Sequence, residues 1–174
     1  MSVNFPKLKA AIHYICEKAS SEPEKLDGIK LNKVLWYSDC MAYLARRQPI
    51  TGTKYMRMPR GPVAKYQQMA LEQLEQEGAL LRGKMSNDGR WPTSYDVIQE
   101  VDKSYFDGEE LAIIDGVYKY VVLESTADKI SDQSHGEIWK LARNKEELPL
   151  FTVFAEGRGT VREEHMRAAT ADLK

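Results

Sequence analysis

The sequence predicts a mainly α-helical, single compact domain, in which a central buried helix is covered by the other segments and a small antiparallel β-hairpin or sheet. Apolar residues recur at helical spacing in several segments, and one of these segments, residues 28–47, is apolar around nearly its whole circumference. The 174 residues are 43% hydrophobic and include no low-complexity tract, so the chain can bury one core.

Residues 28–47 are predicted to form the central helix. Asp27 can accept hydrogen bonds from the first free N–H groups, and Pro49 prevents the helix from continuing. Its continuous apolar face consists of Leu31, Val34, Leu35, Ser38, Met41, Ala42 and Ala45. Because most of this helix should be core, only Asn32 and Lys33 are expected to reach a partner.

The segments on either side of the central helix carry weaker signals. Residues 7–18 show a helical apolar stripe, and residues 50–59, which lie between prolines, are predicted to be extended or to form a hairpin. The Gly61-Pro62 pair is typical of a helix start, so a third helix is expected over residues 62–77.

Two short strands and two helices are predicted next. Residues 80–85 and 95–101 are strand candidates, and an Asp-Gly pair between them suits a turn. Asp107 and Glu110 have the spacing of a capping box at the start of a fourth helix, and residues 126–131 suit a short one.

The last predicted elements are short. Ser134 and Glu137 have the spacing of a second capping box, which would open a helix to about residue 144. Residues 148–154 are predicted as a strand or short helix. We expect residues 5–155 to form the domain and residues 156–174 to form a C-terminal tail with a short helix.

Composition argues against several classes of protein. No run approaches ~18 apolar residues, so no membrane span is expected, and the first residues lack the pattern of a signal peptide. The two cysteines fall in predicted helices and give no disulfide framework, which fits a cytoplasmic location.

Charge is unevenly distributed although the net charge is only −1. Residues 30–90 hold 11 lysines and arginines against 5 acidic residues, whereas residues 91–174 hold 10 against 17. The basic segment could dock an acidic partner or a nucleic acid, or the two halves could compensate each other within one fold.

Few residues suggest chemistry. His13 and Cys16 are three apart on a predicted helix and could contribute two metal ligands, but no second pair completes the site, and packing explains both. Cys40 and His135 could pair as thiol and imidazole, although a cysteine on an apolar helix is typically inert. His135 and Trp139 share one helix face, where the histidine either stabilises the core or contacts a partner. No cofactor is predicted.

The residues around the Gly61-Pro62 pair are candidates for partner binding. Tyrosine, methionine and arginine are enriched at protein interfaces. The alternative is an exposed basic loop whose side chains are solvated. The candidates are Tyr55, Arg57, Met58, Arg60 and Lys65, together with His135.

Four segments resemble a known family. Residues 30–39 are similar to the KLQKLLYFAQ-type central helix of Panacea-domain proteins, the SocA-like antitoxins, some of them phage-associated GepA-type proteins. Residues 60–63 resemble the Tyr-Gly-Pro-Val turn of that family, with Arg60 in place of the aromatic residue. Residues 134–140 and 148–150 resemble its later motifs. The matching positions include Leu31, Lys33, Leu35, Trp36, Tyr37, Gly61, Pro62, Val63 and Trp139.

The resemblance implies a cytoplasmic antitoxin, not an enzyme, that binds and neutralises a protein toxin encoded by an adjacent gene. It names neither the toxin nor the oligomeric state. The alternatives are a DNA- or RNA-binding regulator that uses the basic segment of residues 30–90, and an enzyme of unrecognised type.

Overall fold

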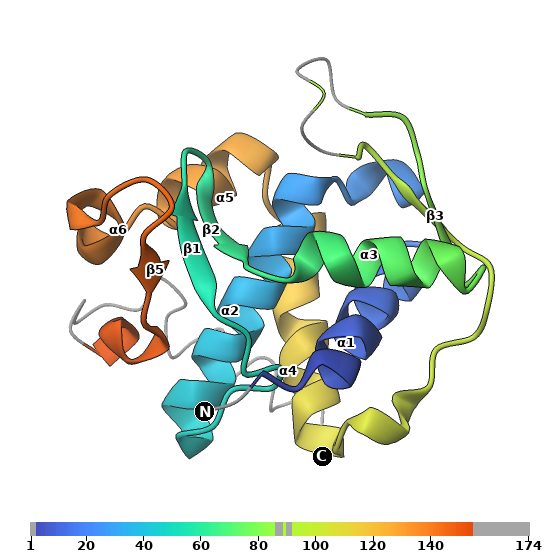
Figure 1. The fold of residues 1–174 in the computed structure, drawn as a ribbon, viewed down its shortest axis with the longest axis horizontal. Helices are drawn as coiled ribbons and strands as arrows, with labels where there is room; N and C mark the ends of the chain where they lie inside the picture. Colours follow the sequence, from blue (N-terminus) through green and yellow to red (C-terminus); the bar gives the residue numbers. More distant parts are fainter. Residues whose placement is uncertain (1–2, 86–88, 90–91, 155–174) are drawn as a thin grey trace.

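The computed structural model describes residues 3–85, 89 and 92–154. It is mainly α-helical with two small antiparallel sheets, which confirms the predicted fold class (Figure 1). The helices are α1 (Phe5–Lys18), α2 (Gly28–Arg46), α3 (Gln67–Gln76), α4 (Gly108–Tyr118), α5 (Ala127–Gln133) and α6 (Glu137–Leu141). Shorter helical segments are η1 (Pro23–Lys25), η2 (Lys103–Tyr105), η3 (Lys119–Leu123) and η4 (Leu150–Phe154). The strands are β1 (Tyr55–Met58), β2 (Gly61–Ala64), β3 (Leu80–Arg82), β4 (Tyr95–Val97) and β5 (Glu147–Leu148).

Helix α2 runs through the middle of the fold and contacts α1, α4, α5, β2 and η4 (Figure 1). The Asp27 carboxylate accepts a hydrogen bond from the Lys30 N–H at 2.8 Å, so this side chain caps the helix as predicted. At the other end Arg47 takes a left-handed φ of 61°. Because Leu31 and Leu35 are buried together with ten other α2 residues, the prediction of a central buried helix is confirmed.

The Gly61-Pro62 segment is a strand, so the prediction that it starts a helix was wrong. β1 and β2 form an antiparallel hairpin in which Met58 lies opposite Gly61, and β5 pairs with the other edge of β1. β2 is an edge strand, where the missing N–H of a proline is tolerated. Gly61 has a φ of +104°, which is far from helical and suits glycine. Helix α3 therefore begins only at Gln67.

The second hairpin consists of β3 and β4, at the opposite end of α3 from the first (Figure 1). Leu80 pairs with Val97 and Arg82 with Tyr95, and a further bridge joins Met85 to Pro92. The two predicted strands are therefore confirmed, although both are shorter than expected. Most of the predicted turn between them lies outside the described residues.

Helix α4 begins with the predicted capping box. The Asp107 carboxylate accepts from the Glu110 N–H at 2.8 Å, and the Asp107 N–H donates to the Glu110 carboxylate at 3.1 Å. The predicted short helix after it is α5, where the Thr126 hydroxyl accepts from the Lys129 N–H at 3.3 Å. Both helix starts could be recognised from the sequence because capping depends on residues only three positions apart.

The second predicted capping box does not form. Ser134 ends α5, and its hydroxyl donates to the Ser131 carbonyl at 2.6 Å; Gly136 occupies the cap position of α6. Helix α6 ends at Leu141, earlier than expected. Residues 148–154 contain both of the predicted alternatives, the end of strand β5 and the short helix η4. The predicted tail, residues 156–174, lies outside the described residues.

Candidate partner-binding site

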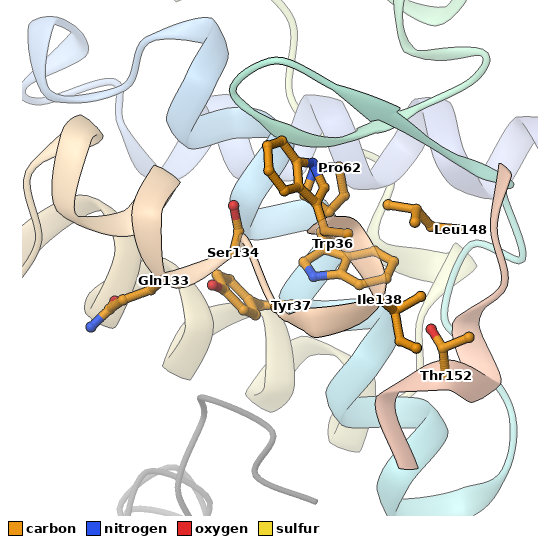
Figure 2. A pocket seen from close by; sticks show the side chains of 10 residues that line it. Trp36, Tyr37, Pro62, Gln133, Ser134, Ile138, Leu148 and Thr152 are labelled. Carbon is orange, nitrogen blue, oxygen red and sulfur yellow. The ribbon is translucent and has the colours of Figure 1, made fainter. Parts of the chain in front are cut away.

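A pocket opens where α2, the β1–β2 hairpin, the α5–α6 segment, β5 and η4 meet. Figure 2 shows the labelled side chains gathering around it from these separate segments. Its lining combines aromatic and aliphatic side chains with neutral polar groups. The lining residues are Trp36, Tyr37, Pro62, Gln133, Ser134, Gly136, Ile138, Trp139, Leu148 and Thr152.

Trp139 is held in place from several directions. Its indole N–H donates to the Met58 carbonyl at 3.2 Å, which ties α6 to the end of β1. The His135 ring stacks on it, with ring centroids 3.6 Å apart and an interplanar angle of 10°. The Arg57 guanidinium carbon lies 4.1 Å from the centroid of the Trp139 ring. Three predicted candidates, Arg57, Met58 and His135, therefore surround one tryptophan.

His135 is half-buried, and its Nε2 atom is shielded from solvent without a hydrogen-bond partner among the described residues. Burial lowers the pKa of its imidazole, and the nearby positive charges of Lys33, Arg57 and Lys140 lower it further, whereas Asp132 opposes them. His135 is therefore neutral near pH 7. One of our two interpretations of the sequence was a core histidine with its hydrogen bonds satisfied. His135 does not fit it, because the side chain is only half-buried and its Nε2 has no partner among the described residues.

Lys33 is buried beneath the hairpin, with 1% of its surface exposed, so the expectation that it reaches a partner was wrong. Its ammonium donates to the Arg60 carbonyl, which also accepts from the Ser131 hydroxyl at 3.0 Å. A Cβ added at Gly61 would lie 2.1 Å from the Lys33 Nζ and 2.3 Å from the Ser134 Oγ. Burial lowers the pKa of Lys33 to about 7. Helix α2 therefore approaches the hairpin turn so closely that the Lys33 ammonium leaves no room for a side chain at position 61.

Asn32 is buried as well, and it too was expected at the surface. Its side-chain amide donates to the Gly28 carbonyl at 2.7 Å within α2. The α2 residues that line the pocket are instead Trp36 and Tyr37.

Asp39 organises the loop that leads into β1. Its carboxylate accepts from the Thr51 N–H at 2.8 Å, from the Thr51 hydroxyl at 2.5 Å and from the Tyr55 hydroxyl at 2.8 Å. Tyr55 is 1% exposed, and its ring packs edge-on against that of Trp36, with the ring centroids 4.9 Å apart. Tyr55 is therefore a core residue and cannot be part of a partner surface, contrary to our expectation. This network could not be predicted from the sequence because its members are 12 to 16 positions apart.

The remaining predicted candidates lie at opposite ends of the hairpin. Arg60 is exposed at the turn, and its guanidinium is 3.8 Å from the Asp128 carboxylate. Lys65 is exposed beyond the other end of β2, where its ammonium lies 5.4 Å from the Tyr66 ring centroid. Arg60 therefore lies at the end of the hairpin that adjoins the pocket, and Lys65 lies at the other end.

The other chemical candidates are packed in the core. His13, Cys16 and Cys40 are all buried, and burial raises the pKa of the Cys16 thiol and lowers that of the His13 imidazole. Among the described residues, no three His, Cys, Asp or Glu side chains are grouped so that they could hold a metal ion. Within the same residues, no helix has the length and apolar character needed to cross a membrane.

A family model described as "Antitoxin SocA-like, Panacea domain" matches residues 31–140, more than half of the chain. The chain belongs to the Panacea-domain family. The match confirms the sequence resemblance, and in this Panacea domain it extends from α2 to α6, covering Trp36, Pro62, Ser134 and Trp139 of the pocket. No curated protein and no solved structure matches the chain significantly.

Proposed function

We propose that this Panacea-domain protein is an antitoxin that binds a protein toxin, the product of an adjacent gene, and neutralises it by direct contact. The observation that carries the proposal is the match of residues 31–140 to the SocA-like antitoxin family. In this proposal the chain acts by binding and performs no catalysis.

The surface around the pocket supports a protein partner. Arg57 and Met58 of β1 are half-buried, as are Trp36 and Trp139 in the pocket wall, so each keeps part of its surface available for contact. Arginine, tryptophan and methionine are among the residues enriched at protein interfaces, and the first two are frequent hot spots. The toxin would therefore bind over the pocket and the adjoining end of the β1–β2 hairpin.

The charges of residues 30–90 favour a protein over a nucleic acid. Much of their positive excess is used within the fold. Lys33 is buried, and other cations pair with carboxylates: Arg46 with Asp107 and Glu110, Arg82 with Glu75, and Lys54 with Glu147. A nucleic-acid site needs several cations free to contact phosphates, and these four cations are buried or paired within the fold.

Co-expression tests the proposal directly. The adjacent gene is induced in a bacterial host with this chain, and separately with a copy of its gene that carries an early stop codon. We expect growth arrest with the truncated copy and normal growth with the intact one, and a stable complex of the two purified proteins. Equal growth arrest in both strains would refute the antitoxin function.

A further inference from the structure

The guanidinium of Arg57 is half-buried but has no hydrogen-bond acceptor or ion-pair partner within the described part of the chain. It rests on the Trp139 ring at 4.1 Å, and its Nε atom is shielded from solvent without a partner. Arg46 and Arg82 are also partly buried, and the Nε of Arg46 likewise lacks a partner among the described residues, but both guanidinium groups contact carboxylates. Burying an N–H donor without an acceptor is unfavourable, so Arg57 is prepared for an acceptor that the described chain does not supply.

The position of Arg57 is fixed before any partner binds. Its backbone N–H donates to the Glu146 carbonyl at 2.8 Å, and its carbonyl accepts from the Lys145 N–H at 2.7 Å. Trp139, which supports the guanidinium, is itself fixed by Met58 and by stacking on His135. A guanidinium that is oriented in advance loses less entropy on binding, and its planar donors match the two oxygens of a carboxylate.

The electrostatic surroundings of Arg57 contain further cations. Arg60 lies at the turn of the same hairpin, 3.8 Å from the Asp128 carboxylate. The positive charges of Arg57 and Lys140 act on His135 beside Trp139 and are opposed by the Asp132 carboxylate, whereas Lys33, with a pKa of about 7, is only partly charged near neutral pH. A carboxylate that binds to Arg57 would be attracted by these cations as well.

An apolar site adjoins this cationic one. Trp36, Pro62, Ile138 and Leu148 line the pocket beside Trp139 (Figure 2). Two large apolar residues on the same elements point to further contact area, because Leu141 of α6 is 80% exposed and Phe151 of η4 is 62% exposed. Exposed apolar groups beside a pocket are characteristic of protein-binding surfaces.

We propose that the toxin is anchored here by an aromatic or large apolar side chain with an aspartate or glutamate close to it. The apolar side chain packs against the rim of the pocket beside Trp36 and Trp139, and the carboxylate accepts hydrogen bonds from Arg57. This inference rests on the proposed function and specifies the partner chemistry of its binding surface.

The test measures the affinity of purified full-length variants for the toxin encoded by the adjacent gene. Arg57→Gln removes the charge but keeps a planar polar side chain, and Thr152→Phe places a bulky ring at the rim of the pocket without changing Arg57. The matched control is Lys103→Gln, because Lys103 pairs with Glu17 of α1, on the side of the molecule away from α6 (Figure 1). Circular dichroism melting shows whether each variant is folded.

We expect Arg57→Gln to raise the toxin Kd roughly 30-fold or more, since truncating one member of a buried charge pair has effects of this size. Thr152→Phe should raise it at least about tenfold, whereas Lys103→Gln should change it less than about twofold. Replacing the toxin's acidic residues one at a time should identify one whose loss weakens binding to the wild type but not to Arg57→Gln. This non-additivity would show that the two charges contact each other.

The possible failures are distinguishable. If the wild-type chain does not bind the toxin, the proposed function itself fails. If the wild type binds and both folded variants bind equally well, the anchor site is refuted while the antitoxin function stands. Binding of a single-stranded RNA oligonucleotide that is lost in Arg57→Gln, with toxin binding intact, would also overturn the assignment of this surface to a protein carboxylate.

Discussion

Replacing Lys33 by methionine should change how the stability of this protein depends on pH. Lys33 is buried, and burial lowers the pKa of its ammonium from the ordinary value of 10.5 to about 7. Methionine has a similar length and an unbranched chain, so it can fill the same space without the charge. The Arg60 carbonyl loses the ammonium donor but keeps the Ser131 hydroxyl at 3.0 Å, and therefore does not lose every partner.

The sign follows from proton binding. Between about pH 7 and pH 10 the unfolded chain holds a proton on Lys33 that the folded chain releases, so the free energy of unfolding rises with pH in this interval. Each unit of pKa difference corresponds to about 1.4 kcal/mol, so the wild type should gain about 2 to 3 kcal/mol relative to Lys33→Met between about pH 7 and pH 9. Below about pH 6 both states are protonated, and the difference between the proteins should be constant.

Urea unfolding of both proteins at a series of pH values measures this difference. Other groups that titrate in the same range, such as the Cys16 thiol in the unfolded chain, are common to both proteins and cancel when one curve is subtracted from the other. We expect Lys33→Met to be the more stable protein near pH 6 and to lose this advantage as the pH rises. Parallel stability curves from pH 6 to pH 9 would refute the argument that burial lowers the pKa of Lys33 in the folded chain.

Three further substitutions test the packing. Leu35→Ala should lower the free energy of unfolding by about 2 to 5 kcal/mol through a core cavity, and a loss below about 1 kcal/mol in urea titration would contradict its burial in α2. Gly61→Ala should lower the free energy of unfolding by about 1 to 3 kcal/mol, because a side chain is strained at this φ and overlaps the Ser134 hydroxyl. An unchanged thermal midpoint would rule out this geometry. Tyr55→Phe removes a donor to the buried Asp39 carboxylate and should cost about 1 to 3 kcal/mol, measured as a shift of the urea midpoint; a shift near zero would mean that this hydrogen bond contributes nothing.

The starts and faces of the principal helices could be predicted because their causes are local. The Asp27 cap of α2 and the Asp107–Glu110 capping box of α4 act within one helical turn, and the apolar spacing of each helix depends only on its own residues. The family could also be recognised, since its motifs are short segments in a fixed order. These features follow from neighbouring residues alone.

The proposed binding surface could be anticipated only in part. Arg57 and Met58 were selected near the Gly61-Pro62 turn and His135 on a separate helix, and the structure brings the three together around Trp139. Their role in binding stays a prediction. Tyr55 is of an equally suitable type but is buried. Residue type indicates what a side chain can do at an interface, whereas only the packing of the chain decides whether it is exposed.

The sequence by itself determined the helical class, the central helix and the membership of the Panacea family, because these depend on short-range periodicity, caps and motifs. The tertiary structure decided that Gly61 and Pro62 form a strand, since this depends on pairing with β1 and on the Lys33 ammonium beneath the turn. It also decided that Lys33 is buried, while the Arg57 guanidinium has no acceptor among the residues that the structure describes. The cost of burying a charge, and the partner that can relieve it, depend on residues distant in the sequence.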